Sequence, residues 1–188
     1  MGRNQGYLVS ETDFPTVAAV DANFLVANVA TGTSEDDRDK LRYFLARAAK
    51  THAVIVIPMP AFAEYLVKAD QAGLESLEQL ERKRHVRLAP FDRAAAFECA
   101  QMNAAALGRG SKRDGSSDHW QKVKIDRQIV AIAKATGAQL IVSSDQDLRS
   151  NAARIGMRCC TIQDLPLPDD ARQGKLELTD EAEEKSSA

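Results

Sequence analysis

Short apolar runs alternate with longer stretches of helical spacing along this chain. The runs have the length and composition of buried strands, and the residues between them repeat apolar positions every three or four residues, as amphipathic helices do. The strands are predicted at residues 17–20, 53–57, 86–89, 139–143 and 157–162. Strands that alternate with helices specify a sheet covered on both faces, so the pattern predicts a three-layer α/β/α domain with a mostly parallel, five-stranded sheet.

Local signals mark the ends of several helices. Ser34, with Asp37 three residues later, has the spacing of a helix N-cap. Pro60 follows the second predicted strand and is suited to open a helix whose early turn carries Glu64. Gly73 is expected to interrupt that helix.

Residues 91–107 are Ala-rich with helical spacing, and residues 108–117 combine Gly, Ser, Lys, Arg and Asp. The second segment is predicted to be a mobile basic loop, after which helical spacing returns over residues 125–136. The apolar stripe of the Ala-rich helix is expected to face the core, with a homodimer interface as the alternative.

Composition fits one domain. The chain has 188 residues, of which 44% are hydrophobic, enough for one well-buried core. We predict an N-terminal extension at 1–16, a domain at 17–165, and an acidic, disordered tail at 166–188. Neither a signal peptide nor a membrane span is expected. The three cysteines lack a CxxC spacing, which favours reduced thiols and a cytoplasmic location.

Four acidic residues stand where strands end or helices open. Asp21 and Asp145 directly follow predicted strands, and the ligand crevice of an open α/β sheet lies outside the carboxyl ends of its strands. Glu64 and Asp126 are expected in the opening turns of helices. Each residue alone has a structural explanation, as a helix cap, a salt-bridge partner or a surface acid favoured by the helix dipole. As a set, the four would converge on one edge of the sheet.

Such a cluster implies a cation. Carboxylates packed together repel one another unless cations neutralise them, and an all-oxygen ligand set selects Mg²⁺ or Mn²⁺. Asn23 could orient Asp21, and Ser143 could contact a metal-bound water or a phosphate. The formal net charge of -2 gives no global attraction for nucleic acid, so binding would need a local basic patch or bound metal. Candidate phosphate contacts, which could equally be solvated loop residues, are Arg109, Lys112, Arg113, Lys122, Lys124 and Arg127.

These motifs resemble those of PIN-domain nucleases, including the VapC-type toxins of toxin–antitoxin pairs. Residues 20–23 look like the family's opening D-x-N motif, and residues 60–66 like its segment around a helical Glu. Residues 124–133 are similar to its D-x-x-I-x-A-x-A helix, and residues 143–148 to its T-x-D-x-D-F turn, with Leu in place of the common Phe.

The resemblance implies a compact α/β/α sandwich that cleaves RNA with Mg²⁺ or Mn²⁺. The acidic quartet would be Asp21, Glu64, Asp126 and Asp145, and the supporting residues would be Asn23, Ser143 and Asp147. It also implies RNA as substrate and allows an antitoxin protein as partner; toxin, RNA-processing and defence roles all fit. Two alternatives stay open at this stage. One is a non-catalytic PIN module that binds RNA or protein. The other is a receiver-like Mg²⁺-binding signalling domain, which would require paired acids after the first strand, where Asp21 has no acidic neighbour.

Overall fold

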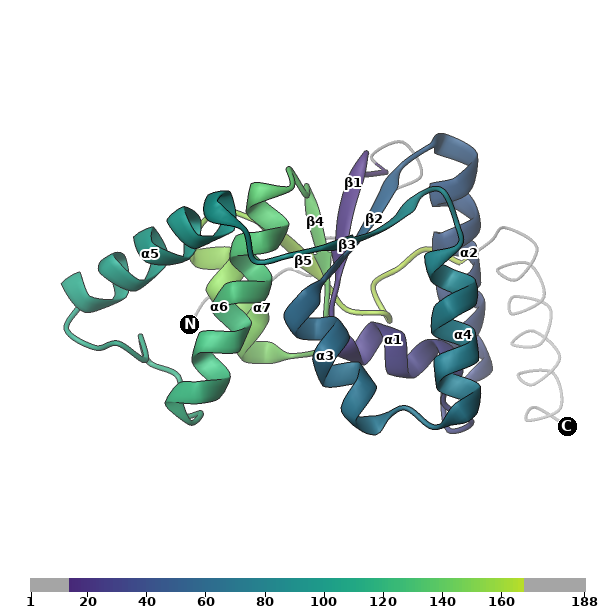
Figure 1. Ribbon diagram of the computed structural model, residues 1–188, viewed down its shortest axis with the longest axis horizontal. Helices are drawn as coiled ribbons and strands as arrows, with labels where there is room; N and C mark the ends of the chain where they lie inside the picture. Colours follow the sequence, from purple (N-terminus) through teal and green to yellow (C-terminus); the bar gives the residue numbers. More distant parts are fainter. Residues whose placement is uncertain (1–13, 168–188) are drawn as a thin grey trace, which may run out of the picture.

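The computed structural model describes residues 14–167, which fold into an α/β sandwich (Figure 1). All five predicted strands are confirmed: β1 (Val17–Val20), β2 (Val54–Pro58), β3 (Val86–Ala89), β4 (Leu140–Val142) and β5 (Arg158–Cys160). The helices are α1 (Ala22–Val29), α2 (Glu35–Thr51), α3 (Met59–Lys68), α4 (Gln71–Glu81), α5 (Arg93–Gly108), α6 (Trp120–Ala135) and α7 (Gln146–Arg154). The predicted tail, apart from its first residues, and most of the N-terminal extension lie outside the described residues.

The strands form one parallel sheet in the order β3-β2-β1-β4-β5. This order differs from the 2-1-3-4-5 order of receiver-like folds, which removes the signalling alternative. At the centre of the sheet, Val20 of β1 pairs with Val142 of β4. The residues that follow, Asp21 and Ser143, are therefore neighbours across the sheet.

Two hydrophobic clusters fill the space on either side of the sheet. One packs α1, α2 and α4 against residues such as Ile55 and Ile57, and the other packs α5, α6 and α7 against residues such as Val56 and Ile141. Alternate strand residues enter opposite clusters, so the strands are apolar throughout, as buried parallel strands are. Figure 1 shows the two groups of helices on opposite sides of the strands.

The chain leaves β1 and β4 in opposite directions. After β1 it turns toward β2 and packs its helices on one face, whereas after β4 it turns toward β5 and packs α7 on the other face. Two diverging connections leave a crevice outside the carboxyl ends of the two central strands, which is where open α/β sheets bind ligands. Asp21 and Asp145 follow these two strands.

Two helix boundaries differ from the predicted ones. The break between α3 and α4 falls at Ala69 and Asp70, because the Asp70 carboxylate caps α4 by accepting the Gly73 N–H at 2.8 Å. Gly73 therefore lies inside α4. Helix α6 begins at Trp120, several residues before the predicted 125, so Asp126 lies in its second turn and does not open it. Among the described residues, no helix has the length and apolar character needed to cross a bilayer.

Gly73 is required by close packing. A Cβ atom at this position would lie 2.9 Å from the Tyr65 hydroxyl oxygen, which is buried and donates to the Gly73 carbonyl at 2.9 Å. We expect Gly73→Ala to lower the free energy of unfolding by about 1–3 kcal/mol, as overpacking does. Urea denaturation would measure the loss, with Gly32→Ala as control because nothing lies within 4 Å of a Cβ at Gly32. Equal losses in the two variants would contradict this account.

Candidate functional site

The four predicted acids line one pocket at the crevice between the central strands. Its volume is about 320 Å³. The pocket draws on the ends of β1 and β4 and on helices α1, α3, α6 and α7. Its polar lining is Asp21, Asn23, Glu64, Lys122, Asp126 and Asp145, and its apolar lining includes Ile125, Ile129 and Leu148.

Asp21 is the most deeply buried of the four acids, with 3% of its surface exposed. It is the N-cap of α1, and its Oδ1 accepts the Phe24 N–H at 2.9 Å. Its Oδ2 accepts the Ser143 hydroxyl and, at 3.4 Å, the Asn23 amide. Burial raises the pKa of Asp21 above its ordinary value despite these hydrogen bonds. The site thus contains a carboxylate that water solvates poorly and that a cation would stabilise.

Asp145 is the N-cap of α7. Its Oδ1 accepts the backbone N–H groups of Asp147 at 2.8 Å and Leu148 at 3.0 Å, and its Oδ2 accepts the Lys122 ammonium at 2.7 Å. Burial acts to raise the pKa of Asp145, but the hydrogen bonds from Lys122 and the backbone outweigh it, so the pKa lies below its ordinary value. Ser143 accepts the Asp145 N–H at 3.0 Å and so links the two strand-end acids.

Asp126 is 5% exposed and lies one helical turn beyond Lys122. Burial raises the pKa of Asp126 to about 6, an effect that the positive charge of Lys122 opposes and the negative charge of Asp145 reinforces. Its Oδ2 lies 3.3 Å from the Lys122 Nζ. Asp126 and Asp145 therefore converge on a single cationic group.

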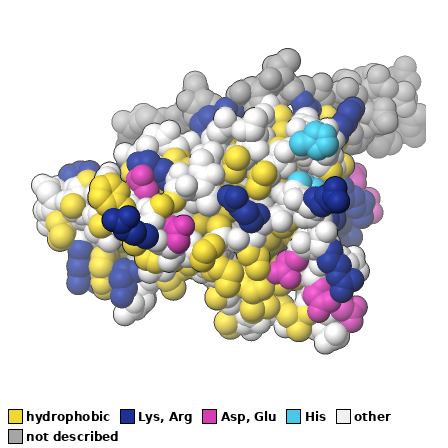
Figure 2. Space-filling model, turned by 45° about the horizontal axis from the view of Figure 1, so that its top comes forward, with side chains coloured by type: hydrophobic (Ala, Val, Ile, Leu, Met, Phe, Trp, Pro, Cys, Tyr) yellow, Lys and Arg dark blue, Asp and Glu magenta, His cyan; other side chains and the backbone are white. Residues whose placement is uncertain are grey.

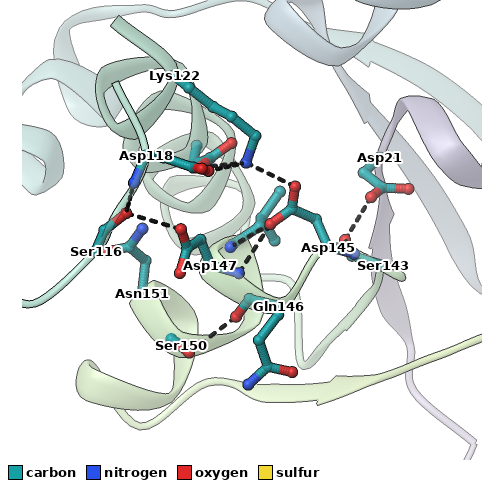
Figure 3. A network of polar contacts seen from close by, with 12 residues as sticks. Asp21, Ser116, Asp118, Lys122, Ser143, Asp145, Gln146, Asp147, Ser150 and Asn151 are labelled. Carbon is teal, nitrogen blue, oxygen red and sulfur yellow. Dashed lines mark hydrogen bonds and ion pairs between the residues drawn. The ribbon is translucent and has the colours of Figure 1, made fainter. Parts of the chain in front are cut away.

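Lys122 is the centre of this arrangement. Its Nζ lies 2.8 Å from Asp118, 3.3 Å from Asp126 and 2.7 Å from Asp145. Figure 3 shows the ammonium group between Asp118 and Asp145. Burial acts to lower the pKa of Lys122, but hydrogen bonds to Asp118 and Asp145 outweigh it and the pKa is raised. Sequence reasoning did not single out Asp118, although Asp118, Lys122 and Asp126 follow one another at the i, i+4 spacing of residues on one helix face.

Glu64 lies at the rim of the pocket. It is in the second turn of α3, later than predicted, and its side chain is 50% exposed, with the Lys68 ammonium 3.9 Å away. The four acids therefore differ in environment: two are buried, Asp145 is half-buried and Glu64 faces solvent.

Two of the three predicted supporting residues contact an acid of the pocket through their side chains, whereas Asp147 does not. Its carboxylate accepts the Ser116 hydroxyl at 2.7 Å, which ties the loop between α5 and α6 to α7 (Figure 3). The same loop is held by Asp114, whose carboxylate binds Arg109 at 2.6 Å and Arg154 at 3.3 Å. The segment predicted to be a mobile loop is thus attached to the domain at several points.

The six basic candidates differ in exposure and in the groups that they contact. Arg127 is 1% exposed and donates to Asn103 at 2.7 Å, so burial excludes it from contact with a substrate in this conformation. Lys112 and Lys124 lie over the half-buried Trp120 ring, 5.1 and 5.9 Å from its centroid. Arg109 is paired with Asp114, Lys122 faces the acids and Arg113 is exposed. On the face drawn in Figure 2, Lys and Arg side chains form separate groups among hydrophobic ones.

The donor set fits a hard divalent ion. Within residues 14–167, no three His, Cys, Asp or Glu side chains are close enough as placed to share a metal ion. Asp126 and Asp145 both contact the Lys122 ammonium, and the nitrogen–oxygen distances of 3.3 and 2.7 Å are longer than the 2.0–2.1 Å metal–oxygen distances of Mg²⁺. Asp126 and Asp145 already bind one cationic group through a single oxygen each. The Lys122 ammonium thus stands where a cation is favoured.

Comparison with known proteins agrees with this architecture. The model of the PIN domain family matches residues 18–154. VapBC2 from Rickettsia felis, solved bound to a DNA fragment from its promoter, is similar in structure, with a TM-score of 0.55 at 15% identity over 77% of this chain and 98% of that chain. DNA-bound VapBC from Salmonella typhimurium gives a TM-score of 0.50 at 17% identity, over 77% and 97% of the two chains. VapC20 from Mycobacterium tuberculosis, a sarcin-ricin loop cleaving toxin, gives 0.49 at 16% identity, over 74% and 95%. No curated protein matches the sequence. Because the family model covers well over half of its length, the chain belongs to the PIN domain family.

Proposed function

We propose that this protein is a Mg²⁺- or Mn²⁺-dependent endoribonuclease whose catalytic domain spans residues 17–165. The observation that carries the proposal is that Asp21, Glu64, Asp126 and Asp145, contributed by four separate segments, line one pocket at the switch point of the sheet. Two of these acids have pKa values raised by burial, which is typical of functional sites.

Asp21, Asp126 and Asp145 would hold the metal, and Glu64 at the rim would bind directly or through water. Held by these carboxylates, the ion would supply Lewis-acid chemistry, which activates water and stabilises a leaving oxygen in phosphodiester hydrolysis. The chain itself supplies orientation. Ser143 fixes Asp21 and the Asp145 backbone together, and the N-cap bonds that Asp145 Oδ1 accepts fix the direction of Oδ2, which contacts Lys122. Ile125, Ile129 and Leu148 supply the apolar lining beside these acids.

A toxin role in a toxin–antitoxin pair is the biological setting that we propose for this activity. The similar VapBC structures are complexes bound to DNA, and an antitoxin-type protein is the partner that we propose by analogy. The described thiols are free, which fits the reducing cytoplasm. Co-expression with the product of the adjacent reading frame would test the partner, and a complex that elutes as one species is the expected result.

Cleavage of a labelled RNA in a metal titration tests the activity. We expect cleavage with Mg²⁺ or Mn²⁺, complete loss with EDTA, and recovery when excess Mn²⁺ is returned. Circular dichroism in EDTA should show an unchanged fold, because the core clusters do not depend on the acids. Cleavage that persists in EDTA would contradict metal dependence.

A non-catalytic PIN module that binds RNA or protein is the second candidate. One observation favours it: the Lys122 ammonium neutralises the two converging acids without any metal. The same titration separates the two functions, because RNA that is bound but left intact at every metal concentration would establish the binding module.

A further inference from the structure

We propose that Lys122 is a movable counter-ion of the acid site, which competes with the divalent ion for Asp126 and Asp145 and is received by Asp118 when that ion binds. The inference rests on the proposed function and adds a regulatory element to the same site. It assigns distinct roles to two residues, Lys122 and Asp118.

The first step is that the ammonium and the metal claim the same oxygens. Lys122 Nζ donates to the Oδ2 atoms of Asp126 and Asp145 at 3.3 and 2.7 Å. A Mg²⁺ ion at about 2.0–2.1 Å from the same oxygens would lie less than about 5 Å from the nitrogen. Both groups are cations in a pocket where two acids are mostly buried, so their repulsion is weakly screened.

The second step is that the ammonium has another partner within reach. Asp118 Oδ2 lies 2.8 Å from Lys122 Nζ, yet Asp118 is not among the residues that line the pocket. The Lys122 side chain is 44% exposed and that of Asp118 is 36% exposed, so the long lysine stem is free to swing at the rim. An ammonium bound to Asp118 alone would be outside the acid pocket and still paired.

The third step is that Asp118 is held in place. Its backbone N–H donates to the Ser116 hydroxyl oxygen at 3.1 Å, and the Ser116 hydroxyl in turn donates to Asp147 on α7 at 2.7 Å (Figure 3). The backbone of Asp118 is therefore linked, through Ser116 and Asp147, to the helix that Asp145 caps. This arrangement leaves the lysine side chain as the moving part.

Displacement of the ammonium makes metal affinity a competition. Without Lys122, the divalent ion would meet two unneutralised carboxylates, so binding should tighten. Without Asp118, the ammonium would lose its alternative partner and would hold the acids more firmly, so binding should weaken. Removal of Asp118 should therefore weaken metal binding only when Lys122 is present. If Asp118 acted only by adding negative charge near the site, its removal would weaken metal binding equally with or without Lys122.

The test is a double-mutant cycle in Mn²⁺ affinity, measured by isothermal titration calorimetry on the full chain. Lys122→Met should bind Mn²⁺ about tenfold more tightly than wild type, which corresponds to about 1.4 kcal/mol. Asp118→Asn should bind about tenfold more weakly than wild type, but the same change in the Lys122→Met background should cost less than about twofold. Lys134→Met is the matched control, because Lys134 lies on the same helix, is 40% exposed and pairs with Glu98 at 2.7 Å. It should leave Mn²⁺ affinity unchanged.

Other outcomes have clear meanings. Equal Mn²⁺ affinity in wild type and Lys122→Met, or an equal cost of Asp118→Asn in both backgrounds, would overturn the counter-ion inference and leave the metal-dependent nuclease standing. Absence of Mn²⁺ binding in wild type together with binding in Lys122→Met would support the inference in its strongest form. Absence of binding in every variant would overturn the metal site and the inference together.

Discussion

Asp21→Asn is expected to reduce RNA cleavage by more than about 100-fold while the protein stays folded. Loss of a residue that only orients a metal ligand costs about 10–100-fold, and loss of a direct ligand should cost more. Asparagine keeps the cap of α1, because its carbonyl oxygen accepts the Phe24 N–H as Asp21 Oδ1 does. Burial raises the pKa of Asp21, which shows that its charged form is poorly solvated in the folded protein. Asparagine carries no charge, so the substitution adds no cost of burying a charge.

Single-turnover cleavage in saturating Mn²⁺ measures this loss. Asp92→Asn is the matched control, because Asp92 also caps a helix, accepting the Ala95 N–H at 2.9 Å, and lies outside the pocket. The control should cleave RNA at the wild-type rate. An Asp21→Asn protein that cleaves within a few-fold of wild type would remove the proposed catalytic site.

Asp126→Asn is expected to stabilise the metal-free protein at neutral pH. In the folded protein the pKa of Asp126 is about 6, against an ordinary value of 3.8. Folding therefore takes up a proton between these pH values, and the free energy of unfolding falls as pH rises through this window. Ionising the buried Asp126 carboxyl lowers the free energy of unfolding. This loss is absent below pH 3.8 and complete above pH 6, where it is on the order of 3 kcal/mol. Asparagine cannot ionise and avoids this loss.

Urea denaturation in EDTA from pH 3.5 to 7.5 would measure the difference. The free energy of unfolding of Asp126→Asn should match wild type at the acid end and exceed it by roughly 2–3 kcal/mol at the neutral end. Saturating Mn²⁺ should reverse the order at neutral pH, because only wild type retains the full ligand set. A constant difference across the whole range would show that Asp126 does not titrate in this window. The expected exchange of stability for function is common at active sites.

The sequence was sufficient to predict the sheet because its strands are buried on both faces. A continuous apolar run such as residues 54–57 is stable only as a strand buried between two layers of helices. Because a helix follows each strand before the next begins, neighbouring strands pair in parallel. The boundaries of helices were harder to predict. The break between α3 and α4 lies before Gly73, the position that the sequence indicated. Asp70 starts α4 by accepting the Gly73 N–H with its side chain, so no glycine is needed at the break.

The placement of the four acids also followed from the sequence, since strand-end and helix positions determine which side chains meet at the crevice. The role of each acid did not, because it depends on burial and on partners distant in sequence. Glu64 is exposed although its neighbours are apolar, and Arg127 is buried although it is charged. The pairing of Lys122 with Asp145 joins residues 23 positions apart, which no local pattern encodes.

The central pairing of β1 with β4 has a consequence during synthesis. The hydrogen bond between Ser143 and Asp21 joins residues 122 positions apart. A ribosome must therefore translate most of the chain before the first strand meets its inner neighbour. Until then the nascent polypeptide lacks Asp145 and its bond to Lys122, so the acid pocket can form only late in synthesis.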